Sequence, residues 1–158
     1  GPWTRILLPF IGALMFLSFM AMAARFWRFN RFTPGDRQWM KRIKDVLCNR
    51  DHGLPEVGKY NAGQKYLFWI MVVSIPVLLF SGIVIWQPWF APFFSIGLMR
   101  VAVVVHALAA WIIILGIVVH VYAAIWVKGT IRAMTRGTVS EAWARHHHRA
   151  WYREMTGK

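Results

Sequence analysis

The sequence predicts an all-α integral membrane protein: a helical bundle with three transmembrane helices in this chain, a short interfacial helix and a basic tail. The chain is 58% hydrophobic, its mean hydropathy is +0.43, and three long stretches carry no charged residue. A hydrocarbon core about 30 Å thick requires about 20 apolar residues at ~1.5 Å of helix rise each. One domain covering residues 1–158 is expected for this length.

The transmembrane helices are expected at about residues 6–27, 66–87 and 99–127, where the three uncharged stretches lie. Helices in the core of a soluble protein would show polar residues at every third or fourth position, and these stretches do not. Between the first two helices, residues 28–65 form a polar loop in which "DRQWMKRIKDVLC" has apolar residues at helical spacing. This segment is expected to be a short amphipathic helix on the membrane surface.

The net charge of +13 follows the expected membrane topology and does not indicate a nucleic-acid partner. The loop 28–65 holds nine Lys or Arg and four Asp or Glu, and the partly helical tail 128–158 holds seven basic and two acidic residues. Only Arg5 and Arg100 lie at the opposite ends of the helices. Because excess Lys and Arg marks the cytoplasmic side, the loop and tail are expected inside, with the N-terminus and the 88–98 loop outside.

Two histidines interrupt the most apolar stretch, "VVVHALAAWIIILGIVVHVYAAIW", at positions 106 and 120. Fourteen residues separate them, which places them within ~40° of one helical face and about 21 Å apart along the axis. An ionisable side chain in a membrane helix is costly and indicates function. Heme b takes neutral imidazole nitrogens as axial ligands, so His106 and His120 are candidate heme ligands at two depths. The alternative is a pair of histidines that form hydrogen bonds between helices.

The whole chain resembles the cytochrome b subunit of membrane-bound respiratory formate dehydrogenases. The resemblance implies a four-helix, diheme protein of the bacterial inner membrane. Such a protein accepts electrons from an iron–sulfur subunit, which is fed by a molybdenum or tungsten catalytic subunit outside, and passes them to a quinone near the cytoplasmic face. The stretches that carry the resemblance are "RILLPFIGALMFLSFM", "GKYNAGQKYLFW", "SGIVIWQPWFAPFFSI", "VHALAAW", "VHVYAAIWVKGTIRAM" and "AWARHHHRAWYRE".

By this resemblance, His106 would ligate the outer heme and His120 the inner heme. The chain departs from the family in two ways. The family's first helix, which carries a ligand of the inner heme, would precede Gly1, and Leu8 stands where the family has the histidine of a His-Pro-Phe motif. Leucine has no lone pair for iron, so one heme and two hemes both remain alternatives.

The segment "YNAGQK" resembles the family's quinone pocket, with Asn61 and Gly63 at its binding positions and Gln64 beside them. An amide can donate a hydrogen bond to a quinone carbonyl, and glycine allows a ring to approach the backbone. Asn61 is also a good N-cap for the second transmembrane helix. The residues alone favour the cap, whereas the resemblance favours the quinone.

The histidine run 146–148 falls in the tail, and three consecutive helical positions point in different directions, so they cannot bind one metal ion together. A solvated basic tail is expected there instead.

The expected function is electron transfer through heme b from a formate dehydrogenase iron–sulfur subunit to membrane quinone. The chain itself is not expected to oxidise formate. Two alternatives remain: the equivalent subunit of a hydrogenase or thiosulfate reductase, and a membrane anchor with reduced or no heme.

Overall fold

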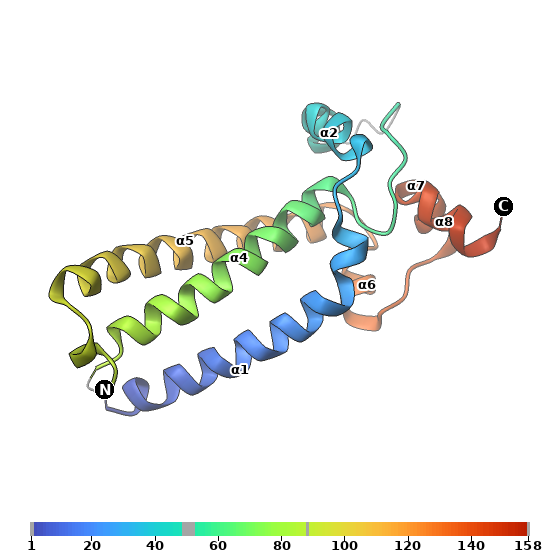
Figure 1. Ribbon diagram of the computed structural model, residues 1–158. Coiled ribbons are helices and arrows are strands. Elements are labelled where there is room, and N and C mark those ends of the chain that lie inside the picture. The colour runs from blue at the N-terminus through green and yellow to red at the C-terminus, as the bar shows by residue number, and fades with distance from the viewer. Residues whose placement is uncertain (1, 49–52, 88, 158) are drawn as a thin grey trace. The chain divides into compact units, whose positions relative to one another are not determined.

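The computed structural model describes residues 2–48, 53–87 and 89–157, and these residues form helices and no strand (Figure 1). Gly1 and residue 88 of the expected outer loop lie outside the described residues. The all-α prediction is therefore confirmed. In chain order the elements are α1 (Pro2–Phe26), η1 (Trp27–Asn30), α2 (Pro34–Lys41), α3 (Ile43–Leu47), α4 (Ala62–Ile85), η2 (Ala91–Phe93), α5 (Ile96–Trp126), α6 (Thr130–Arg136), α7 (Glu141–His147) and α8 (Arg149–Thr156).

Three helices of the described chain, α1, α4 and α5, are long and apolar enough to cross a membrane, which confirms the predicted number. Each lies within a few residues of its expected position. The largest differences are at the starts of α1 and α4, which begin at Pro2 and Ala62 and not at residues 6 and 66. Few residues along the three helices are buried in the isolated chain. Apolar surface of this extent is stable only against lipid hydrocarbon or other apolar protein.

The chain divides into two compact units, which are described separately. Unit 1 consists of residues 1–26 and 69–118, and unit 2 of residues 27–68 and 119–158. Helices α4 and α5 contribute to both units. The expectation of one domain over residues 1–158 stays a prediction.

In unit 1, α1 and the neighbouring parts of α4 and α5 run side by side (Figure 1). Aromatic side chains pack α1 against α4. The rings of Phe16 and Phe80 meet edge to face with centroids 6.4 Å apart, and those of Phe10 and Trp86 do the same at 6.4 Å. Edge-to-face pairs of this kind stabilise packing beyond the area they bury. Between α4 and α5 the contact is polar and involves Ser81 and His106.

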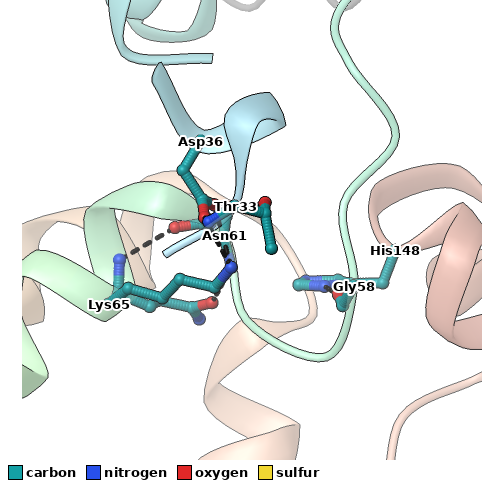
Figure 2. A network of polar contacts seen from close by, with 7 residues as sticks. Thr33, Asp36, Gly58, Asn61, Lys65 and His148 are labelled. Carbon is teal, nitrogen blue, oxygen red and sulfur yellow. Dashed lines mark hydrogen bonds and ion pairs between the residues drawn. The ribbon is translucent and has the colours of Figure 1, made fainter. Parts of the chain in front are cut away.

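In unit 2, a buried ion pair connects α2 to the first turns of α4 (Figure 2). The Lys65 Nζ atom lies 2.9 and 2.8 Å from the two carboxylate oxygens of Asp36. The side chains are only 8% and 10% exposed, respectively. Asp36 also accepts hydrogen bonds from the backbone N–H and hydroxyl of Thr33, at 2.6 and 3.0 Å.

Burial alone would raise the pKa of the Asp36 carboxyl, but the hydrogen bonds from Lys65 and Thr33 outweigh it and hold that pKa below its ordinary value. The carboxylate is therefore ionised at neutral pH and holds α2 against α4.

The expected single amphipathic helix between the first two transmembrane helices is two short helices, α2 and α3, separated at Arg42. The Arg42 guanidinium bonds to Asp45 at 3.0 Å and to the carbonyl oxygen of Gly53. The largest apolar residue of α2, Trp39, is buried. Its indole lies 3.6 Å from the place where a Cβ on Gly63 would be, so it packs against the start of α4.

The basic tail forms the helices α6, α7 and α8. Within unit 2 it contacts the loop that precedes α4. His148 lies between α7 and α8, is only 5% exposed, and donates from Nδ1 to the carbonyl oxygen of Gly58 at 2.7 Å (Figure 2). Arg153 forms an ion pair with Glu56. The expectation of a solvated histidine run is therefore wrong for His148, although His146 is exposed.

We expect the Asp36–Lys65 pair to respond strongly to loss of one partner. Replacement of Lys65 by Met should lower the free energy of unfolding by about 3 kcal/mol, because it leaves a buried carboxylate without its counter-charge. The double variant Asp36→Leu/Lys65→Met should be much less destabilised. Denaturant titration of the purified protein in detergent measures both.

The Arg42–Asp45 pair, which is much more accessible to water, serves as the control for this comparison. Asp45→Asn should cost less than about 1 kcal/mol, because water screens a partly exposed ion pair. A double variant of the buried pair as unstable as Lys65→Met would contradict the prediction.

The packing of the tail should weaken in acid because of His148. Burial lowers its pKa, and its hydrogen bond to Gly58 offsets this only in part. The unfolded chain therefore binds a proton at higher pH than the folded chain, so stability is full above about pH 6.5 and falls as the pH is lowered below it. Protease resistance of the tail, measured from pH 8 to pH 5, should show this loss.

In this experiment His148→Gln keeps an amide donor for the Gly58 carbonyl but does not titrate, so its profile should be flatter than that of the natural chain. The exposed His146→Gln should leave the profile unchanged. An equal acid sensitivity in His148→Gln would rule out His148 as the cause.

Candidate functional site

The imidazole of His106 rests against α4 within unit 1. Its Nδ1 atom lies 3.0 Å from the Ser81 hydroxyl oxygen. The next residue, Gly82, lies so close that an added Cβ would be 3.4 Å from His106 Cε1 and 3.7 Å from Nδ1. No hydrogen bond to Nε2 of His106 is present among the described residues. Nδ1 of His106 therefore contacts α4, whereas Nε2 is not used by the described residues.

His120 lies fourteen residues further along the same continuous helix, α5, in the part that belongs to unit 2. Its side chain is half-buried and forms no hydrogen bond with the described residues. Both predicted histidines are therefore on one uninterrupted apolar helix, and each has an imidazole nitrogen that no described residue uses.

This donor set fits heme better than a bare metal ion. The described residues contain no group of three or more His, Cys, Asp or Glu side chains that could hold an ion. A structural or catalytic zinc ion needs three or four protein ligands, whereas heme iron needs only one or two axial ones and favours histidine. One imidazole at each of two places in an apolar helix meets the second requirement.

Leu8 lies in α1 and is 67% exposed. Its side chain offers nothing to iron, and α1, α4 and α5 contain no histidine besides the two in α5. Any further axial ligand must come from outside these three helices, or from a residue type other than histidine.

The quinone candidates Asn61 and Gln64 form a reciprocal cap at the start of α4. The Asn61 side-chain oxygen accepts from the Gln64 backbone N–H at 2.9 Å, and the Gln64 side-chain oxygen accepts from the Asn61 backbone N–H at 2.9 Å. The N-cap interpretation of Asn61 is confirmed, and it explains why α4 begins at Ala62.

The cap leaves the donor groups of both amides unused. Each side-chain oxygen is engaged by a backbone N–H, so the NH₂ groups of Asn61 and Gln64 point away from that bond and make no hydrogen bond within the described residues. Capping and donation to a carbonyl are therefore compatible. Gly63 also lies against the Trp39 indole, where an added Cβ would be in ordinary van der Waals contact at 3.6 Å.

Two features of the site were not predicted from the sequence. Ser81 lies 25 residues before His106, and no local pattern connects a serine in an apolar stretch with a histidine on another helix. The Asp36–Lys65 pair spans 29 residues, and both residues looked like ordinary members of a charged loop. The only available signal was the rarity of a polar residue within α4.

Comparison with known proteins assigns the chain to a family. The family description "Prokaryotic cytochrome b561" matches residues 3–137. The chain is 48% identical over 151 residues to the formate dehydrogenase cytochrome b556(fdo) subunit of Escherichia coli strain K12, which covers 96% of this chain and 71% of that protein.

Two further relatives carry similar names. Identity is 44% over 151 residues to the nitrate-inducible cytochrome b556(Fdn) subunit of Escherichia coli strain K12, covering 96% of this chain and 70% of that protein. It is 41% over 150 residues to the formate dehydrogenase cytochrome b556 subunit of Haemophilus influenzae strain ATCC 51907, covering 95% of this chain and 63% of that protein. The chain therefore belongs to the prokaryotic cytochrome b561 family of membrane proteins, for which heme b is the implied cofactor.

Proposed function

We propose that this chain is the heme b electron-transfer subunit of a formate dehydrogenase complex and delivers electrons to membrane quinone. The observation that carries the proposal is the pair of imidazoles in α5, each with a ring nitrogen that the described chain does not use. The relatives named as cytochrome b556 subunits of formate dehydrogenases support formate as the source of the electrons.

His106 and His120 are the proposed axial ligands, one for each iron. Heme b bound there would supply a one-electron iron couple within the hydrocarbon region of the membrane. The histidines are about 21 Å apart along α5, so the two proposed heme sites lie at different depths. An electron would then cross the bilayer in shorter transfers. The helix thereby sets the depth of each site, and the imidazole sets its orientation.

Asn61, Gly63 and Gln64 are the proposed quinone contacts. The two amide NH₂ groups can donate to a quinone carbonyl while both amide oxygens keep the cap intact. Burial raises the pKa of the adjacent Tyr60, so that phenol stays protonated at neutral pH. The Asp36–Lys65 pair holds the first turns of α4, and so holds the two amides, in place.

We place the chain in the bacterial inner membrane, with its N-terminus outside and the loop and tail, residues 28–65 and 128–158, in the cytoplasm. The excess of Lys and Arg in these two segments supports this orientation. An iron–sulfur subunit and a molybdenum or tungsten catalytic subunit are the proposed partners on the outer side. The quinone site would then take up its protons from the cytoplasm.

A membrane anchor with fewer hemes is the second candidate, and Leu8 is the observation that favours it. A hydrogenase or thiosulfate reductase subunit is supported by no relative named above. The heme content of the purified complex distinguishes an electron-transfer subunit from a membrane anchor.

Replacement of either α5 histidine should remove heme. In the purified complex, His106→Ala and His120→Ala are each expected to lose one heme per chain relative to the natural protein, because each removes the nitrogen that binds iron. The heme-to-polypeptide ratio measures this directly. His146→Ala, in the exposed tail, should leave the ratio unchanged, and a full ratio in His106→Ala would exclude His106 as a ligand.

Asn61 allows its two roles to be separated. Asn61→Asp keeps an oxygen that caps α4 but has no NH₂ group, whereas Asn61→Ala has neither. We expect Asn61→Asp to retain its stability and to weaken quinone binding about tenfold, which corresponds to one lost hydrogen bond of about 1.4 kcal/mol.

Asn61→Ala should show the same loss of binding together with a loss of about 1 kcal/mol in stability. Binding is measured by titration of the purified complex with a quinone analogue, and stability by denaturant unfolding. Natural quinone affinity in Asn61→Asp would show that Asn61 acts only as a cap.

A further inference from the structure

The Ser81 hydroxyl oxygen contacts two kinds of group at once. It lies 2.5 Å from the backbone carbonyl oxygen of Val77 and 3.3 Å from that of Leu78, both in its own helix. In the other direction it lies 3.0 Å from Nδ1 of His106 in α5. The side chain is buried, with 8% of its surface exposed.

The short contact to Val77 determines where the hydroxyl hydrogen lies. A serine hydroxyl has one hydrogen, and a carbonyl oxygen can only accept. Two oxygens 2.5 Å apart would repel each other unless the hydrogen lies between them. Ser81 therefore donates to its own helix, and only its lone pairs are left for His106. The hydrogen between Ser81 and His106 must then belong to Nδ1 of the imidazole.

We propose that Ser81 is the positioning residue for His106: it selects the Nδ1–H tautomer and leaves the Nε2 lone pair for the heme iron. This inference rests on the proposed function of His106 as an axial ligand. In water the neutral imidazole exchanges between two tautomers, and only one has its free lone pair on Nε2. Ser81 stabilises that one and also fixes the plane of the ring, as supporting residues do for other metal-binding histidines.

Gly82 also lies against the His106 ring. A Cβ at this position would lie 3.4 Å from Cε1 of His106, at the short end of ordinary van der Waals contact. The absence of a side chain lets the α4 backbone approach the edge of the ring beside Ser81. Two consecutive residues of α4 therefore define both the chemistry and the orientation of one imidazole.

The two α5 histidines differ in this respect. His120 has no hydrogen-bond partner in the described part of the chain, whereas His106 donates to Ser81. An imidazole that donates from Nδ1 is a stronger electron donor through Nε2, which favours the ferric state and lowers the reduction potential. Between these two histidines the described residues provide such a partner to His106 alone, so the effect favours electron flow from the site of His106 toward that of His120.

The test uses the full complex in its membrane, with Ser81→Ala, Ser81→Thr and the control Ser74→Ala. Ser74 is another buried serine of α4, and its loss should affect packing but not His106. The readouts are heme per chain and the reduction potential of each heme from a spectroscopic redox titration. In Ser81→Ala, one heme should become easier to reduce, with a several-fold higher ferrous-to-ferric ratio at the midpoint of the natural protein.

Ser81→Thr keeps the hydroxyl and should return this potential to that of the natural protein. If Ser81→Ala loses the heme instead, its restoration in Ser81→Thr with the natural potential supports the same conclusion. The inference is overturned if Ser81→Ala matches Ser74→Ala in both readouts, or if Ser81→Thr behaves like Ser81→Ala.

His106→Ala distinguishes this failure from failure of the proposed function. If His106→Ala keeps all its heme, both the ligand assignment and the role of Ser81 are wrong. If His106→Ala loses one heme while Ser81→Ala is unchanged, His106 is a ligand and only the role of Ser81 is wrong.

Discussion

A polar group inside the hydrocarbon of a membrane must find its partners within protein or cofactor, because water is absent there. This constraint governs α5, where two imidazoles stand in an otherwise apolar helix. At His106 one nitrogen is satisfied by Ser81 and the other is not used by the described chain. A soluble protein could leave that nitrogen to water, whereas no water is available to it within the hydrocarbon. This supports the proposal that heme b, the cofactor implied for the family, binds at His106.

At the other end of α4 the same constraint has a different solution. The first backbone N–H groups of a helix have no partner within the helix, and Asn61 and Gln64 satisfy two of them with their side-chain oxygens. In each amide the NH₂ group then makes no hydrogen bond with the described residues. The Asn61–Gln64 cap that begins α4 thus leaves two amide NH₂ groups at the place proposed for quinone. The structural and functional interpretations of Asn61 are therefore compatible.

Charge is concentrated in unit 2, where the described residues use it for specific contacts. Asp36 and Lys65 connect α2 to α4, and Arg153 and Glu56 connect the tail to the loop before α4. His148 adds a neutral hydrogen bond between the same two segments. Some of the basic residues that support the proposed cytoplasmic location therefore also hold together the segments around the start of α4.

The sequence by itself determined the fold class, the number of long apolar helices and their approximate bounds, because hydropathy and helix length are properties of contiguous residues. It also identified the two histidines of α5, since an ionisable residue in such a stretch is conspicuous without any neighbour. Tertiary structure alone decided what each of these groups contacts. Ser81 and His106 meet across two helices, as do Asp36 and Lys65, and His148 folds back onto Gly58, 90 residues away. Such partners depend on how helices pack, and no spacing along one helix encodes them.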